Sequence, residues 1–298
     1  MGVLLSIPGH YWRRPGATFW MASSGPERSH RSRTSRCTHW HADHVGLALR
    51  LTDLADARCC LGADDAPLPA AYATERERRL ERDATAMRAW GVPDAIVDAI
   101  IQANRPSPLP DRFPVDPLSA GETVGGLEVV DTPSHTKGHI SLLTESGLLV
   151  GDALLPTYTP NVGGSDTRTL GANPLETYRD TLERITDLVG GTGVAAHRST
   201  GTTRSIYPGH GEPCSPERLA TVEDHHDHRR ARVVTALEGR EPRTPWQVAR
   251  TLFGDLEGVH ATFGAGEAAA HLESLASRDV VCASRRSGVL HYEAFSTN

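Results

Sequence analysis

Lysine is almost absent from this chain, because Lys137 is the only one among 31 basic residues. No apolar run approaches the roughly 18 residues that a membrane-spanning helix needs, so no such span is expected. Aromatic residues make up only 5% of the 298 residues, but 38% are hydrophobic, which suffices for one large α/β domain or a smaller one with an appendage. The five cysteines contain no Cys-x-x-Cys pair, which disfavours a cysteine zinc knuckle or a disulfide framework and fits a reducing cytoplasm.

The beginning of the chain differs from the rest, with six arginines and one acidic residue before His39. Ala22–Arg36 has almost no apolar content and is not expected to form a strand or a helix unaided. An Arg- and Ser-rich start resembles a transit peptide, but cleavage there would remove the support of the motif that follows. A mis-assigned start or an altered reading frame explains residues 1–37 at least as well.

The middle of the chain alternates between helical and strand patterns. Helices are expected over Val45–Leu54, over Ala71–Trp90, after Pro93 and over Leu175–Val189, and strands over Gly126–Asp131, Ile140–Leu143, Leu148–Val150 and Ser205–Tyr207. Residues 71–103 then form a helical insertion in a domain that covers residues 38–215.

Residues 216–298 change to helices closed by a hairpin. Helices are expected over Glu217–Leu237, after a capping box at Thr244–Gln247 and over Gly266–Ser277, and strands over Val280–Ala283 and Val289–Tyr292. Three helices and a two-stranded wing have the order of a winged helix. This segment has ten arginines and 12 acidic residues, whereas a domain that binds the phosphate backbone of nucleic acid is expected to be basic. This unit is therefore expected to pack on the preceding domain, narrow an active-site mouth or form a contact between copies.

The strongest chemical signal is the H-x-H-x-D-H motif at residues 39–44. His39 and His41 are two residues apart in an extended segment, so both can project to one side. Asp43 and His44 follow at the turn into a helix and point to a neighbouring spot. One short segment can thus supply two metal ions with imidazole and carboxylate ligands, which suit Zn²⁺, with Fe or Mn as alternatives.

Three further candidate ligands follow strand signals in Gly- or Pro-rich turns. His135 lies in the segment TPSHTKGH, Asp152 in LVGD and His210 in YPGHG. Ligands at the ends of separate strands can converge on one edge of a sheet, which predicts a binuclear site there.

These motifs, in this order, closely resemble the metallo-β-lactamase superfamily, specifically its glyoxalase II-like hydrolases. The similarity covers about Thr38–Pro213, although the family's early Asp-containing strand-turn is not recognisable. The resemblance implies an αββα sandwich, followed here by the small winged helix that one branch of the superfamily carries.

The resemblance also implies the roles of the ligands. His39, His41 and His135 hold the first of two zinc ions, Asp43, His44 and His210 hold the second, and Asp152 bridges both. A hydroxide that bridges the two ions is the nucleophile, which Asp43 and Asp152 also orient. His139 is expected to hold a ligand or its loop, and Lys137 to neutralise an anionic substrate.

The favoured function is hydrolysis of a small thioester or ester. An RNA phosphodiesterase, a lactonase or a β-lactamase remain alternatives, because substrate choice lies in loops such as Thr157–Gly171. The acidic balance, a net charge of −6, disfavours a nucleic-acid partner. A third hypothesis is a degenerate, non-enzymatic homologue, since the family has strands before its first His motif where this chain has the polar stretch Arg31–Cys37.

Overall fold

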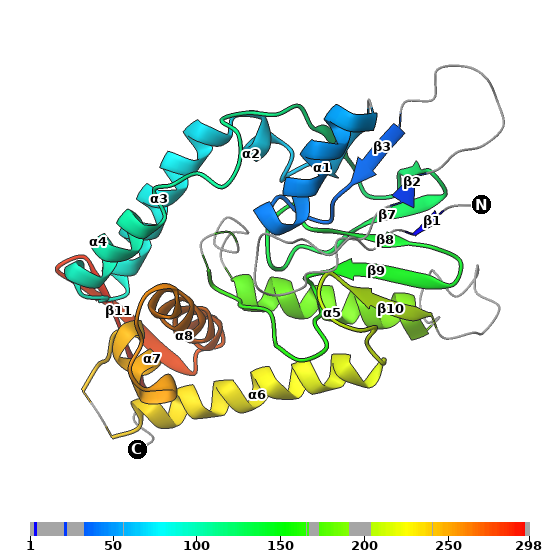
Figure 1. Ribbon diagram of the computed structural model, residues 1–298. Coiled ribbons are helices and arrows are strands. Elements are labelled where there is room, and N and C mark those ends of the chain that lie inside the picture. The colour runs from blue at the N-terminus through cyan, green and yellow to red at the C-terminus, as the bar shows by residue number, and fades with distance from the viewer. Residues whose placement is uncertain are drawn as a thin grey trace. The chain divides into compact units, whose positions relative to one another are not determined.

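The computed structural model describes residues 3–4, 21–22, 33–55, 57–164, 166, 173–190, 204–239 and 241–295 (Figure 1). The chain folds into two compact units. Unit 1 comprises Met1–Thr74, Pro108–Pro160 and Asp180–Ala220, and unit 2 comprises Glu75–Ser107, Asn161–Arg179 and Thr221–Asn298. Most of residues 1–37 lie outside the described residues, and the domain boundaries predicted at residues 38 and 216 stay predictions.

Unit 1 contains a parallel three-stranded sheet and a five-stranded sheet. The first has the order β3-β4-β5, with strands Arg33–Arg36, Ala57–Gly62 and Asp116–Leu118. The second has the order β10-β9-β8-β7-β6, with strands Ser205–Pro208, Gly147–Gly151, Ile140–Leu143, Leu127–Asp131 and Thr123–Val124. Its β10–β9 pair is parallel and its other pairs are antiparallel. Two short strands, β1 (Val3–Leu4) and β2 (Met21–Ala22), form a further antiparallel pair.

Helices pack against both sheets of unit 1 (Figure 1). Val45 and Ala48 of α1 (Ala42–Ala55) are buried in one apolar cluster with Cys59 and Leu61 of β4. The part of α5 (Pro174–Gly190) that belongs to unit 1 contacts the turn after β7, where Thr181 Oγ1 donates a 2.7 Å hydrogen bond to the carbonyl oxygen of Pro133. A short helix, α2 (Pro67–Ala70), follows β4. The predicted mixed α/β class is confirmed.

The expectation for Ala22–Arg36 is wrong at its end, because Arg33–Arg36 forms β3. This strand pairs with β4 in parallel register, from Arg33 opposite Ala57 to Arg36 opposite Cys60. The inward-facing residues are small: Ser35 is 3% exposed, and Cys37, just past the strand, is 6% exposed. Backbone pairing with a buried neighbour therefore makes a strand from a segment with little apolar content, since tertiary context overrides intrinsic strand propensity.

Unit 2 consists of helices and one hairpin. Its elements are α3 (Tyr72–Ala89, in this unit from Glu75), α4 (Asp94–Ala103), α6 (Glu217–Leu237, in this unit from Thr221), α7 (Pro245–Phe253), α8 (Val259–Ser277), β11 (Val281–Arg286) and β12 (Val289–Ala294). The predicted capping box is present, and β11 and β12 pair antiparallel. α8 begins at Val259 rather than Gly266, because Ala261 and Ala265 extend its buried face. That this arrangement is a winged helix stays a prediction. Among the described residues, no helix combines the length and hydropathy of a membrane span.

A buried histidine pair lies between α6 and α8. His226 is 1% and His271 0% exposed, and Nδ1 of His226 lies 3.4 Å from Nε2 of His271. Burial, reinforced by neighbouring His225 and Arg179, lowers the pKa of His226 to about 3, and burial also lowers that of His271. Both rings are therefore neutral in the folded protein near pH 7.

Acidification should therefore destabilise unit 2. Below about pH 6.5 the unfolded chain protonates histidines that stay neutral in the folded protein. Their contribution to the free energy of unfolding is therefore complete above that pH and is lost as pH falls toward the folded pKa of about 3. For one such histidine the loss at about pH 5 is about 2 kcal/mol. The free energy of unfolding of His226→Gln, measured with urea, should fall less between about pH 7.5 and 5 than that of the wild type. His228→Gln, at an exposed position of α6, serves as the control, and an unchanged acid loss in His226→Gln would contradict the expectation.

Candidate metal centre

The H-x-H-x-D-H segment lies between β3 and α1. The carbonyl oxygen of His41 accepts hydrogen bonds from the amides of His44 and Val45, both 2.9 Å long, which start the helix. This turn places Asp43 and His44 in the first turn of α1, while His39 and His41 precede it. Nε2 of His39 lies 3.0 Å from Nδ1 of His41, so both imidazoles project to the same side, as predicted.

The other three candidates come from strand ends of the five-stranded sheet. Asp152 directly follows β9 and His210 lies two residues after β10, and because these strands are parallel, their carboxyl ends meet at one edge. His135 lies in the connection from β7 to β8, and β8 runs antiparallel to β9, so this connection reaches the same edge. The predicted convergence of strand ends is what the topology produces.

All seven candidate residues meet in one place, in three overlapping groups whose potential ligand atoms lie within 4.8 Å of one another. The groups are His39, His41 and His135; Asp43, His44 and His210; and His39, His44 and Asp152. Asp152 lies between the first two groups, with Oδ1 3.4 Å from Nε2 of His44 and Oδ2 3.9 Å from Nε2 of His135. Nε2 of His210 lies 3.4 Å from Oδ2 of Asp152 and 3.2 Å from Asp43.

The two carboxylates are ionised at neutral pH. Burial raises the pKa of Asp152, but the neighbouring His210 and His44 outweigh burial and hold it well below its ordinary value. Burial is likewise outweighed at Asp43, where His210 is the main cause of a pKa of about 2. Asp152 and Asp43 together raise the pKa of His210 to about 10. Positive charge therefore stabilises the two carboxylates, and a protonated imidazole or a bound cation can supply it.

His39 has the opposite character. It is fully buried, and burial together with the neighbouring His44 lowers its pKa well below the ordinary value. It is therefore neutral at pH 7, and neutral imidazole is the form that binds metals. Thr38 Oγ1 lies 3.2 Å from its Nδ1, which leaves Nε2 on the side of His41.

The donors and the space around them fit a metal centre. Oδ1 of Asp152 is buried and has no hydrogen-bond partner among the residues that the structure describes. A side chain at Gly209 would place Cβ 2.3 Å from this oxygen and 2.8 Å from the His44 ring, so the P-G-H-G turn needs glycine there. Five imidazoles and two carboxylates are a donor set that Zn²⁺ accepts.

His139 supports the site, as expected, through the main chain of Asp152. Its Nε2 accepts a 3.2 Å hydrogen bond from the Asp152 amide, and its Nδ1 lies 2.9 Å from Thr132 Oγ1. Burial lowers the pKa of His139 to about 3, so the ring is neutral, and its Nδ1 proton is directed to the threonine. His139 thus fixes where the chain turns after β9.

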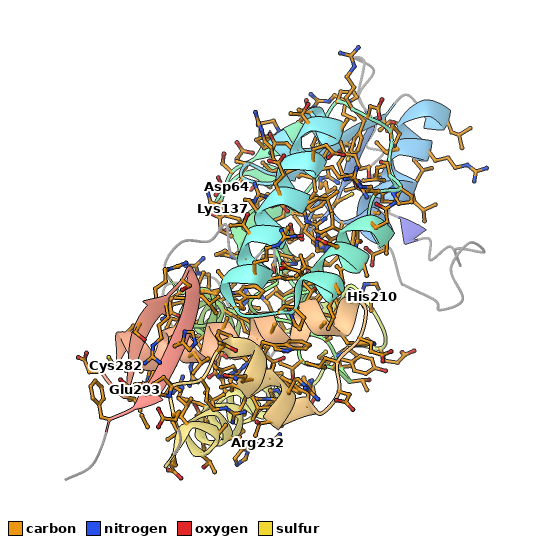
Figure 2. The ribbon with its side chains drawn as sticks, turned by 90° about the vertical axis from the view of Figure 1, so that its left-hand side faces the viewer. Asp64, Lys137, His210, Arg232, Cys282 and Glu293 are labelled. Carbon is orange, nitrogen blue, oxygen red and sulfur yellow. The ribbon has the colours of Figure 1, made fainter. Side chains whose placement is uncertain are left out.

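Two charged residues near the site, Lys137 and Asp65, have partners that the sequence does not predict. Lys137, expected to neutralise substrate charge, has its Nζ 3.3 Å from Oδ1 of Asp64, and Figure 2 shows the two side chains together. Asp65, missed by sequence analysis, is a buried carboxylate that hydrogen-bonds to the segments of His39 and His135. The only sequence signal for it is a pair of aspartates after the apolar strand pattern of residues 59–61.

Two solved structures resemble this chain over nearly its whole length. A metallo-beta-lactamase family protein of Thermus thermophilus is 25% identical with a TM-score of 0.64, and the match covers 98% of each chain. A beta-lactamase domain protein of Burkholderia ambifaria is 22% identical with a TM-score of 0.72, over 98% of this chain and 91% of that one. These likenesses confirm the predicted fold.

Sequence comparisons identify the family. A protein of Methanocaldococcus jannaschii named "Probable metallo-hydrolase" is 36% identical over 87 residues, which are 29% of this chain and 35% of that relative. The match thus spans about a third of the relative's length. The family model of the metallo-beta-lactamase superfamily matches residues 37–197, more than half of the 298 residues. This chain therefore belongs to the metallo-beta-lactamase superfamily.

Proposed function

We propose that this chain is a binuclear zinc hydrolase that acts on a small thioester or ester. The observation that carries the proposal is the position of Asp152, whose carboxylate lies beside donors of both groups, His135 on one side and His44 and His210 on the other. A carboxylate between two sets of imidazoles is what two adjacent cations require, whereas a single ion would leave half of the donors unused.

The ligand roles follow the two outer groups. In this proposal His39, His41 and His135 hold one ion, Asp43, His44 and His210 hold the other, and Asp152 bridges them. These residues would hold ions whose chemistry is to lower the pKa of a bound water and to polarise a carbonyl oxygen. Zinc is the first choice for these donors, with Fe or Mn as alternatives.

The donors are unequally buried, so the cluster has a buried side and an exposed side. His39, His44 and Asp152 are buried, whereas the side chains of Asp43, His210 and His135 are 55%, 34% and 26% exposed. Substrate therefore reaches the cluster from the exposed side. Asp43 is ionised there and could accept a hydrogen bond from a nucleophilic water, and Asp152 could orient that water from the buried side of the cluster.

The substrate class rests on the turns around the donors. The segments Thr132–His139 and Pro208–Gly211 are similar to those of glyoxalase II-like hydrolases, which favours a thioester or related ester. The loop Thr157–Gly171, where substrate selectivity was expected, lies partly outside the described residues.

Zinc content tests the metal proposal directly. The wild-type chain, loaded with Zn²⁺ and freed of excess, should carry about two ions by elemental analysis. His135→Ala and His210→Ala each remove a donor from one group and should each retain about one ion. His228→Ala, at an exposed position of α6, should keep the wild-type content. A wild-type content near zero would contradict the proposal and favour the non-enzymatic hypothesis.

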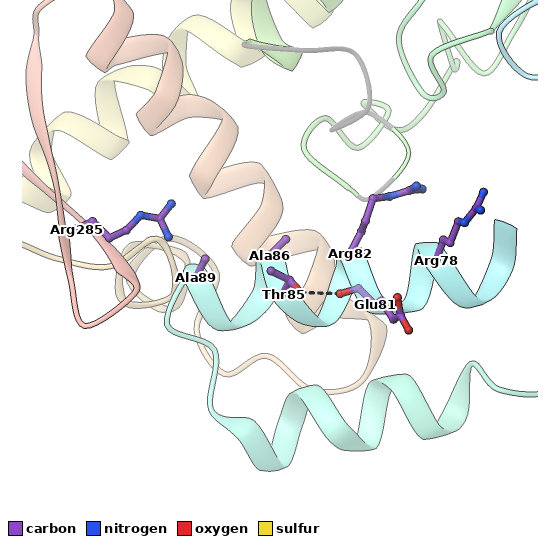
Figure 3. Close-up of a pocket in the computed structure, with 7 residues that line it drawn as sticks. All are labelled: Arg78, Glu81, Arg82, Thr85, Ala86, Ala89 and Arg285. Atoms are coloured by element: carbon purple, nitrogen blue, oxygen red, sulfur yellow. Dashed lines mark hydrogen bonds between the residues drawn. The ribbon is translucent and has the colours of Figure 1, made fainter. Parts of the chain in front are cut away.

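An RNA phosphodiesterase is the second candidate, and an open cavity in unit 2 favours it. The cavity, of about 620 Å³, is lined by Arg78, Arg82 and Arg285 with a single acidic residue, Glu81 (Figure 3). Arginine side chains bind phosphate oxygens well because their N–H groups match the geometry of the anion. The same pair of cations would act on a phosphodiester.

Substrate assays separate the candidates. Short acyl-thioesters should be hydrolysed by the zinc-loaded chain, and a chelator should return the rate to background, because the nucleophile depends on the metal. His135→Ala should lower kcat/KM by at least about 100-fold, more than the loss of a residue that only supports a ligand. Single-stranded RNA, a lactone and a β-lactam are assayed in parallel. Metal-dependent cleavage of RNA without thioester turnover would replace the first candidate by the second.

A further inference from the structure

Asp65 is a carboxylate with 1% exposure in the turn between β4 and α2. Its oxygens accept three hydrogen bonds, from the amide of Trp40 at 3.2 Å, from Oγ1 of Thr136 at 2.6 Å and from the amide of Gly138 at 2.7 Å. These donors come from segments 25, 71 and 73 residues away in the chain. One buried side chain thus joins two segments that are also linked by a 2.8 Å hydrogen bond from the amide of Ile140 to the carbonyl oxygen of Thr38.

Both joined segments supply donors of the same group. Trp40 lies between His39 and His41, and Thr136 and Gly138 follow His135 in the turn between β7 and β8. His39, His41 and His135 are the group with three imidazoles. Asp65 therefore accepts hydrogen bonds from the amide between His39 and His41, from the hydroxyl of the residue after His135 and from an amide three residues after His135.

The contact is close and itself fixed. The amide of Asp65 donates a 2.9 Å hydrogen bond to the carbonyl oxygen of Gly62, and its carbonyl oxygen accepts one of 3.1 Å from Leu68. A Cβ at Gly138 would lie 2.1 Å from the Asp65 amide nitrogen and 2.7 Å from Oδ1. The turn that carries His135 can approach Asp65 this closely only because residue 138 is glycine.

We propose that Asp65 is a positioning residue for the first metal site of the proposed hydrolase, an inference that rests on that proposed function. It holds the His39–His41 segment and the His135 turn at a fixed separation, so that three imidazole nitrogens face one ion before the ion binds. Hydrogen bonds to a charged acceptor are stronger than neutral ones, which suits a link between two turns. Without it, ion binding would have to order both segments.

Asparagine is the sharpest substitution at this position. It keeps the size of the side chain, but one oxygen becomes an NH₂ group, so at least one of the three donors faces another donor. The neighbouring Asp64 offers a matched control, because its side chain is 58% exposed and it pairs with Lys137 at 3.3 Å. Asp64→Asn makes the same chemical change one residue away, but it alters only an exposed ion pair with Lys137, and such pairs contribute little to stability.

The experiment measures zinc affinity by competition with a chromophoric chelator, together with the visible absorption spectrum of the Co²⁺-loaded protein. Folding of each metal-free variant is checked by far-UV circular dichroism. Asp65→Asn should bind one of its two zinc ions, that of the first site, about 10- to 100-fold less tightly than the wild type does and change the Co²⁺ spectrum. Asp64→Asn should match the wild type in both measurements.

Two results would overturn the inference. One is wild-type zinc affinity and an unaltered Co²⁺ spectrum in folded Asp65→Asn, which would leave Asp65 a purely structural role. If Asp65→Asn does not fold, Thr136→Val takes its place, since it removes only the 2.6 Å hydrogen bond and should weaken zinc binding in the same direction. Unchanged affinity in that variant is the second such result. Failure of the wild-type chain itself to bind zinc would instead remove the proposed function.

Discussion

The structure depends on keeping five imidazoles and two ionised carboxylates within a few ångströms of one another. His39 and Asp152 are buried there, although burial disfavours the charged forms of both. Ring nitrogens of His44 and His210 lie only 3.2 Å apart, so at most one hydrogen can stand between them. Such crowding does not stabilise a protein by itself, and the surrounding fold must enforce it. Bound cations would turn the same crowding into a favourable interaction.

The fold enforces this arrangement through the main chain. Parallel pairing of β9 and β10 brings the residues after them to one sheet edge, and the β7–β8 connection returns to the same edge. His139 binds the amide of Asp152, and Asp65 binds amides in the two turns of the first group. Donor side chains are thus positioned by polar groups that hydrogen-bond to the main chain of the segments that carry them.

Sequence reasoning succeeded where spacing alone fixes geometry. The motif at residues 39–44 and the three strand-end candidates could be singled out because each is a short local pattern, and the structure brings their side chains together. It failed at Arg33–Arg36, since a polar segment becomes a strand only through pairing with the buried β4. The role of Asp65 could not be predicted from the sequence for the same reason, because its partners lie up to 73 residues away and an aspartate after a strand fits many roles. What depends on long-range contacts carries no local signal.

The division between buried and exposed donors explains why reaction type is easier to infer than substrate. The buried donors are constrained by their neighbours, because a Cβ added at Gly209 would lie 2.3 Å from Oδ1 of Asp152. Asp43 and Lys137 are exposed, and His135 is half-buried. Substitutions around them can alter which carbonyl or phosphoryl group fits while the buried cluster stays intact. We therefore expect substitutions on the exposed side to change selectivity more readily than substitutions of the buried donors.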